Sequence, residues 1–253
     1  GAFLFTVIPI NWLILLDVLG AVFGVGLLVF VTIPKVISQG ETIHLLTDTK
    51  FGVKKLYENK GLWHIMLNGA VFTLLFMPAA SLYPLMTMGY FGQNVGQAGL
   101  VEVVYSVGML AGGAVIGFFG KWKDRMKPIF MAYVVVGTTI GASGLLPGTT
   151  QGFFYFLLLN AGAGFATPYF NTLLMAIIQQ SYEPNVLGRV LGVFNSLMTL
   201  PGPIGLIFAG PLTDKIGVEK MFLIAGIGTL LCGIVLFFVH PLLEIMIKNY
   251  RKN

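Results

Sequence analysis

Apolar segments long enough to cross a membrane are the dominant feature of this sequence. An α-helix rises 1.5 Å per residue, so about 20 apolar residues span the roughly 30 Å hydrocarbon core of a bilayer. The segments of that length are residues 12–33, 62–86, 97–120, 128–147, 152–178, 189–210 and 220–240. Residues 1–9 are also apolar but are too short to cross alone. We therefore predict an all-α membrane protein, a helical bundle with about seven transmembrane helices and a partial one.

The composition excludes most soluble classes of protein. Hydrophobic residues make up 56% of the chain and charged residues 10%, against roughly 25% charged residues in an ordinary soluble domain. The one cysteine, Cys232, lies inside an apolar segment, which rules out a disulfide framework or a thiolate metal site. The sequence has no Walker loop, dinucleotide-binding fingerprint or Ser/His/Asp arrangement. We therefore expect no cofactor and no enzymatic activity.

Basic residues are distributed unequally between the two sides of the predicted bundle. Thirteen of the fifteen Lys and Arg residues fall in four polar stretches that lie on one side when the apolar segments are counted: 34–61, 121–127, 179–189 and 241–253. The other two, Lys215 and Lys220, share an opposite-side loop with Asp214 and Glu219. Because positive charge stays on the cytoplasmic side during insertion, the basic stretches are predicted to be cytoplasmic, and 87–96, 148–151 and 211–219 external. The expected location is the bacterial cell membrane, and the positive charge indicates topology rather than a nucleic-acid partner.

The spacing of the apolar segments predicts four regions. Residues 1–33 would end an N-terminal transmembrane domain, 34–61 would form a cytoplasmic connector, 62–240 a C-terminal six-helix transmembrane domain, and 241–253 a basic cytoplasmic tail. Within the connector, apolar residues recur at helical spacing over 41–58. This amphipathic helix could lie on the membrane surface with its basic side towards anionic headgroups, or form a solvated linker. Because the chain begins with Gly1 inside an apolar segment, we expect a C-terminal fragment of a longer protein.

Small residues and prolines mark the interiors of the predicted spans. Glycines recur at fourfold spacing in the pairs Gly20/Gly24, Gly108/Gly112, Gly113/Gly117 and Gly137/Gly141. Such pairs permit close helix packing in lipid. Prolines remove a backbone donor and predict kinked or broken helices near Pro78, Pro84, Pro168, Pro201 and Pro203. Ordinary helix packing explains these features as well as a moving bundle does.

Glu102 is the one carboxylate in the six spans after the connector that lies away from their ends. An ionised carboxylate in hydrocarbon is costly, so we expect it to face a cavity, pair with a cation or take up a proton. The alternative is that it stabilises the positive end of its own helix from the interface. Side chains that could line a sparsely polar, aromatic cavity for a large lipophilic ligand are Asn68, Phe72, Phe76, Tyr105, Asn160, Phe165, Tyr169, Asn171, Phe194 and Asn195.

Three loop sequences resemble the major facilitator superfamily of transporters. The run Gly-Phe-Phe-Gly-Lys-Trp-Lys-Asp-Arg-Met-Lys at 117–127 stands where that superfamily repeats its Gly-x-x-x-Asp-Arg-x-Gly-Arg/Lys motif, although the second glycine is absent. Residues 183–190 resemble the loop between the tenth and eleventh spans, and 210–217 the outer loop before the last span. The resemblance implies two six-helix domains that rock about a central cavity. It also implies that Asp124, Arg125 and Arg189 latch the cytoplasmic ends.

Within that superfamily, the chain resembles macrolide-efflux (Mef-type) exporters. The resemblance is carried by Leu-Gly-Val-Phe-Asn-Ser-Leu-Met-Thr-Leu-Pro-Gly-Pro-Ile-Gly at 191–205 and by 59–62, 143–147 and 214–218. It implies proton-coupled export of hydrophobic drugs by alternating access, with Glu102 in proton coupling or cation attraction. The implied partners are a small hydrophobic drug, protons, membrane lipids and the N-terminal domain of the same protein. The alternatives are a major facilitator transporter of another solute and a non-transporting membrane receptor or scaffold.

Overall fold

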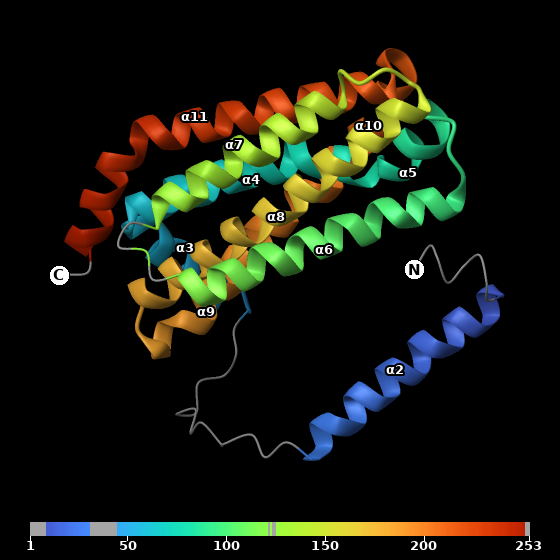
Figure 1. Cartoon of the computed structure of the whole chain (residues 1–253). Coiled ribbons are helices and arrows are strands. Elements are labelled where there is room, and N and C mark those ends of the chain that lie inside the picture. The colour runs from blue at the N-terminus through green and yellow to red at the C-terminus, as the bar shows by residue number, and fades with distance from the viewer. Residues whose placement is uncertain (1–8, 31–44, 121, 123–124, 251–253) are drawn as a thin grey trace.

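The computed structural model describes residues 9–30, 45–120, 122 and 125–250, and helices account for nearly all of them. The elements run in the order α2 (Ile10–Phe30), α3 (Leu45–Glu58), α4 (Lys60–Ser81), α5 (Tyr83–Leu85), the π-helical turn η1 (Met86–Tyr90), α6 (Val95–Phe119), α7 (Met126–Ser143), α8 (Thr150–Ser181), α9 (Pro184–Thr199), α10 (Pro201–Ile216) and α11 (Val218–Tyr250). Figure 1 shows α4 to α11 side by side in one elongated bundle, with α2 drawn apart from it.

Six stretches of the described chain are long and apolar enough to cross a membrane. They are Lys60–Tyr90, Val95–Phe119, Met126–Ser143, Thr150–Ser181, Pro184–Ile216 and Val218–Val239. Helix α2 occupies the first predicted segment, and its described apolar part is Ile14–Leu27. These helices confirm the predicted fold class, an all-α membrane bundle.

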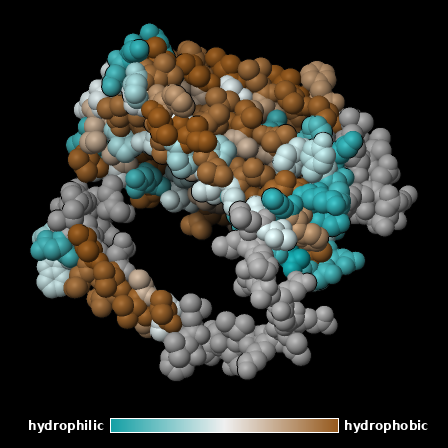
Figure 2. Space-filling view, turned by 180° about the vertical axis from the view of Figure 1, so that it is seen from behind, coloured by the Kyte–Doolittle hydropathy of each residue, from teal (hydrophilic) through white to brown (hydrophobic). Residues whose placement is uncertain are grey.

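The surface of the bundle is apolar where a soluble protein would be charged. Phe118 is 83% exposed, Phe238 75% and Leu110 74%. Figure 2 shows hydrophobic residues over most of one face of the bundle, with hydrophilic residues gathered in separate patches. Exposed apolar surface on this scale needs lipid or another protein surface to cover it.

Close backbone contact between α6 and α8 sets the geometry of one side of the bundle. A Cβ atom at Gly112 would collide with the Phe165 carbonyl oxygen, and one at Gly164 with the Tyr105 carbonyl oxygen. A Cβ atom at Gly108 would likewise collide with the Ala161 carbonyl oxygen. By contrast, Gly113 has nothing within 4 Å of a Cβ position among the described residues. The two consecutive glycine pairs therefore differ: Gly108 and Gly112 pack against α8, and Gly113 and Gly117 face outward.

Four further helix–helix contacts complete the bundle. Helix α11 packs against both α7 and α4, while α7 also packs against α8, and α10 packs against α4. A Cβ at Gly226 of α11 would meet the backbone of Gly141, and a Cβ at Gly137 would lie 2.7 Å from Leu230 Cγ. The predicted pair at 137 and 141 thus lies at a helix interface, where small residues let backbones approach.

Prolines break two of the six spans and leave a third continuous. Helix α8 runs without interruption through Pro168. The span that begins with α4 is interrupted at Leu82, continues through Pro84 and ends in the π-helical turn η1. The span at 184–216 is divided into α9 and α10 at Pro201. The missing N–H group of a proline leaves a carbonyl unpaired, so these are points where a helix bends.

Two adjacent glycines offer a matched test of the α6–α8 contact. Gly112→Val should destabilise the protein by about 3 kcal/mol, because the added side chain collides with the α8 backbone and cannot be relieved by a rotamer change. Gly113→Val should leave the thermal unfolding midpoint of the detergent-solubilised protein nearly unchanged. Equal destabilisation by the two substitutions would contradict this account of the contact.

The predicted topology can be tested with two residues at opposite ends of α8. Gln151 and Gln179 are both exposed, and α8 is 32 residues long, enough to place them on opposite sides of a bilayer. In a background with Cys232→Ala, Gln151→Cys should react with an impermeant maleimide from outside intact cells. Gln179→Cys should react only after the cytoplasmic side is opened. Reaction of both from outside would refute the topology.

Candidate functional site

Glu102 lines a cavity of about 530 Å³ between α4, α5, α6 and α8. We call it the outer cavity, because it lies towards the predicted external ends of these helices. Its wall combines apolar groups with several oxygen-bearing side chains: Phe76, Ala80, Ser81, Tyr83, Pro84, Val101, Glu102, Tyr105, Ser106 and Asn160. Glu102 is exposed among the described residues. Drug-sized ligand pockets span about 300–1,000 Å³ and are mostly apolar with a few polar groups, and the outer cavity has both properties.

Two hydrogen bonds fix the polar wall of the outer cavity. The Asn160 amide Nδ2 donates to the Val101 carbonyl oxygen at 2.8 Å, directly before Glu102 in the chain. The hydroxyls of Tyr105 and Thr167 lie 3.0 Å apart. The single proton of Thr167 is donated to the Ala163 carbonyl, so Tyr105 is the donor of the pair. Both bonds hold α6 against α8.

One buried acceptor in the outer cavity has no partner among the described residues. Asn160 is 2% exposed, and its Oδ1 atom makes no hydrogen bond within the described chain. A buried, unpaired polar atom is costly unless water or a ligand pairs with it. Asn160 Oδ1 is enclosed by protein, and the Glu102 carboxylate is the charged acceptor that the cavity wall offers to a donor or a cation.

A smaller cavity of about 200 Å³ lies deeper in the bundle, between α4, α7, α8 and α9. We call it the middle cavity. Its walls include the stacked rings of Phe72 and Phe76, with centroids 5.1 Å apart, and the Tyr133 and Phe170 rings 5.3 Å apart. Tyr133 is 3% exposed and its hydroxyl has no partner among the described residues. Phe76 also lines the outer cavity, so the two are neighbours.

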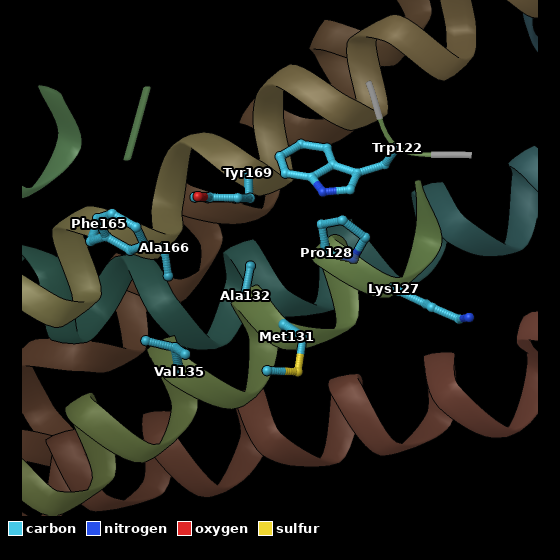
Figure 3. A pocket seen from close by; sticks show the side chains of 9 residues that line it. All are labelled: Trp122, Lys127, Pro128, Met131, Ala132, Val135, Phe165, Ala166 and Tyr169. Carbon is cyan, nitrogen blue, oxygen red and sulfur yellow. The ribbon is translucent and has the colours of Figure 1, made fainter. Parts of the chain in front are cut away.

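A third cavity of about 590 Å³ lies between α7, α8 and the loop that joins α6 to α7. We call it the inner cavity, because that loop is predicted to be cytoplasmic. Figure 3 shows the rings of Phe165, Tyr169 and Trp122 in a row on one side, with Val135, Met131 and Pro128 on the other. The Trp122–Tyr169 and Phe165–Tyr169 centroid distances are both 5.7 Å. Ala132 and Ala166 line both this cavity and the middle one.

The predicted cavity residues are distributed over three separate cavities rather than one. Tyr105, Asn160 and Phe76 join Glu102 at the outer cavity. Phe72, Phe76 and Asn171 line the middle cavity, and Phe165 and Tyr169 line the inner one.

Three further candidates lie away from these cavities. Asn68 donates from Nδ2 to the Cys232 carbonyl at 3.0 Å and so ties α4 to α11. Phe194 belongs to the buried core, and Asn195 is exposed on α9.

Three lining residues, Trp122, Tyr133 and Thr167, are not among the candidates that the sequence indicates. Tyr133 and Trp122 sit among many aromatic residues, and nothing in their neighbours singles them out. Thr167 was accessible in principle, since it lies seven residues after Asn160 and four before Asn171. That spacing puts all three on one face of a helix.

The connector helix α3 is held against α9 by several contacts around one arginine. Arg189 Nε lies 3.0 Å from Asp48 Oδ1, and the guanidinium carbon lies 5.1 Å from the centre of the Phe51 ring. Gly52 allows the approach, because a Cβ there would lie 2.8 Å from the Arg189 carbonyl oxygen. Tyr182 adds a hydrogen bond to the Lys55 carbonyl at 3.1 Å. The apolar side of α3 therefore covers protein, with Leu56 fully buried.

The predicted latch residues have different positions. Asp124 lies outside the described residues. Arg125 is half-buried directly before α7. Arg189 forms an ion pair with Asp48 of α3. The partner of Arg189 was not foreseen, since nothing in the sequence links 48 to 189.

Comparison with known proteins decides the family. The model of the Major Facilitator Superfamily matches residues 1–206. The chain belongs to this superfamily. Six described spanning helices and relatives from bacteria make it a multi-pass protein of the cell membrane.

The relatives include drug efflux proteins. Macrolide efflux protein A of Streptococcus pyogenes is 32% identical over 250 residues, which is 98% of this chain and 61% of that protein. The protein of the same name from Enterococcus faecalis is 33% identical over 81% of this chain and 64% of its own length. Multidrug efflux pump Tap of Mycolicibacterium fortuitum is 30% identical over 59% of this chain. The chain thus spans less than two thirds of the length of the macrolide efflux relatives, and their likeness confirms the resemblance found in the sequence.

The contact between Asp48 and Arg189 can be measured by a double-mutant cycle. Asp48→Asn and Arg189→Gln should show a coupling free energy of about 0.5–1 kcal/mol, because both side chains are partly exposed and the pair is screened by solvent. The readout is the thermal unfolding of the detergent-solubilised protein. Lys54→Gln, at an exposed position of the same helix, should be additive with Arg189→Gln. Full additivity of the Asp48 and Arg189 changes would contradict a specific contact.

Proposed function

We propose that this protein is a secondary active exporter of hydrophobic drugs, with macrolides as the first class to test. The observation that carries the proposal is the outer cavity: about 530 Å³ of largely apolar space with a single carboxylate, Glu102, in its wall. Likeness to macrolide efflux protein A over 98% of the chain supports the same substrate class. Membership of a transporter superfamily favours transport over an enzymatic role.

The lining of the outer cavity suits a lipophilic molecule that carries a positive charge. Phe76, Tyr83 and Tyr105 supply aromatic surface, and the Glu102 carboxylate supplies the counter-charge. Asn160 positions the backbone next to Glu102 through its hydrogen bond to the Val101 carbonyl. A lipophilic cation gains from both parts of the site, because apolar burial gives affinity and a few convergent polar groups give orientation.

Glu102 also offers a means of coupling export to protons. Glu102 is the one carboxylate among the residues that line this cavity, and a carboxylate can bind either a proton or a cation. A proton and a cationic drug therefore compete for the same group, and each disfavours the other. In an alternating-access cycle, a proton entering from outside would displace the drug, and loss of the proton to the cytoplasm would restore the site. Asp124, Arg125 and Arg189 would steady the cytoplasmic ends during this cycle.

The transport cycle we propose requires a second domain opposite the outer cavity. Glu102 and Ser106 of α6 are exposed, and so are Leu110 of the same helix and Phe208 of α10. An N-terminal domain of the same protein would cover part of this surface, and membrane lipids the rest. The drug would then bind between the two domains, which move relative to each other.

The role of Glu102 is open to a direct test in cells that express the whole protein. Glu102→Gln should reduce macrolide export at least tenfold at equal membrane levels, because the counter-charge and the proton site are both lost. Glu102→Asp should retain part of the activity, since charge remains although the side chain is one methylene shorter. The measurement is drug accumulation in cells with and without a protonophore, which should abolish export by the unchanged protein.

A second carboxylate, Glu183, provides the control for this test. Glu183→Gln removes an exposed carboxylate at the start of α9, outside the three cavities, and should leave export unchanged. Helix α6 begins at Val95 and has no acidic residue in its first turn, so Glu102 lies too far along the helix to stabilise its start. If Glu102 has no role in export, Gln would leave resistance near normal. Normal export by the Gln variant would thus retire Glu102 as a functional residue.

A further inference from the structure

We propose that the inner cavity is an entry site at which a hydrophobic drug dissolved in the cytoplasmic leaflet first binds, before it reaches the Glu102 cavity. The inference rests on the proposed export function and adds to it the route by which the drug enters. Three observations support it: the inner cavity lies on the face of α8 that carries Phe165 and Tyr169, its lining is aromatic, and it shares Ala132 and Ala166 with the middle cavity.

The inner and outer cavities lie on different faces of α8. Asn160, Thr167 and Asn171 share one face of the helix, and they line the outer and middle cavities. Phe165 lies five residues after Asn160, a rotation of about 140° at 3.6 residues per turn, and Tyr169 continues its line four residues later. The helix therefore presents a polar face to the site that holds Glu102 and an aromatic face to the inner cavity.

The mouth of the inner cavity is apolar and accessible. Met131 is 57% exposed and Phe165 37%, and both line the cavity. Phe118 and Phe119, at the end of α6 before the same loop, are 83% and 72% exposed. Apolar side chains this exposed need lipid or another protein surface to cover them, and we take the cover at this mouth to be lipid. A molecule dissolved in the bilayer would then meet the inner cavity from the side rather than from water.

The lining matches a molecule that sits at the inner boundary of the bilayer. Trp122, Tyr169 and Phe165 offer a row of rings, and Lys127 lies at the rim (Figure 3). Figure 3 shows the Lys127 amine directed away from the row of rings. Tryptophan and lysine near helix ends, as Trp122 and Lys127 are here, lie at the headgroup level of a membrane, whereas Tyr169 and Phe165 lie within α8. The cavity therefore extends from that level into the hydrocarbon, where amphipathic drugs with ring systems concentrate.

Two small residues, Ala132 and Ala166, belong to the walls of both the inner and the middle cavity. They are 5% and 3% exposed. The middle cavity in turn shares Phe76 with the outer one. The middle cavity of about 200 Å³ is smaller than a drug-sized pocket. A drug therefore passes this wall towards Glu102 only when α7 and α8 move apart during the transport cycle.

Protection of a single cysteine tests binding at the inner cavity directly. In the whole protein made free of other cysteines, with Cys232→Ala, Met131→Cys should react with a membrane-permeant maleimide. A saturating macrolide such as erythromycin should slow that reaction at least fivefold. Met109→Cys, exposed on α6 and outside the three cavities, should react at the same rate with and without the drug.

Two outcomes of the labelling experiment would overturn the proposal. Equal rates at Met131→Cys with and without drug, in a protein that exports the drug, would remove the inner cavity as an entry site while leaving the export function intact. Slowing by added phospholipid but not by drug would make it a lipid site. Failure of the whole protein to export any drug would instead refute the proposed function, which the same cells report separately.

Narrowing the shared wall tests the route from the inner to the middle cavity. Ala132→Leu should lower macrolide export at least fivefold while drug still protects Met131→Cys, because the first binding site remains and the passage is filled. Ala142→Leu, at a half-buried position of the same helix outside the three cavities, should not affect export. Unchanged export by a normally inserted Ala132→Leu protein would refute the route.

Discussion

The close approach of α6 and α8 is the contact on which the candidate site depends. Three glycines, Gly108, Gly112 and Gly164, let backbone meet backbone where any larger side chain would collide. In lipid there is no hydrophobic force between helices, so such packing and the hydrogen bonds beside it hold a bundle together. The Asn160–Val101 and Tyr105–Thr167 bonds form across this same contact. Glu102 takes its place in the cavity wall as a consequence of that packing.

Helix α8 serves two chemically different environments because of its periodicity. One face carries amide and hydroxyl groups into the bundle, and the other carries aromatic rings outward. The helix remains continuous through Pro168, so the two faces are rigidly related. A rigid helix between the inner cavity and the middle one would suit the proposed entry of apolar molecules from the membrane.

Much of the fold was predictable from the sequence, because the bilayer imposes a simple rule of length and polarity on each span. The six later spans were found within a few residues of their ends, and the pair of Gly108 and Gly112 was identified as a packing motif. The site was less predictable. Glu102 stands out because charge is rare in a span, but Tyr133 and Trp122 are ordinary aromatic residues until the fold brings them to a cavity. The contact of Asp48 with Arg189 joins positions 141 apart, and no local pattern indicates such a pairing.

The span that divides at Pro201 has one partner common to both halves and one that holds a single half. Both α9 and α10 pack against α4, and Gly202 and Gly205 of α10 fit beside Met77 and the Leu74 carbonyl. Helix α9 is also held by α3 through the contact of Arg189 with Asp48. Neither Pro201 nor Pro203 has an N–H group to complete the helical hydrogen bonds across the joint. A movement of α3 would therefore act on α9 directly and on α10 only across this joint or through α4, so the joint is the point at which the span would bend.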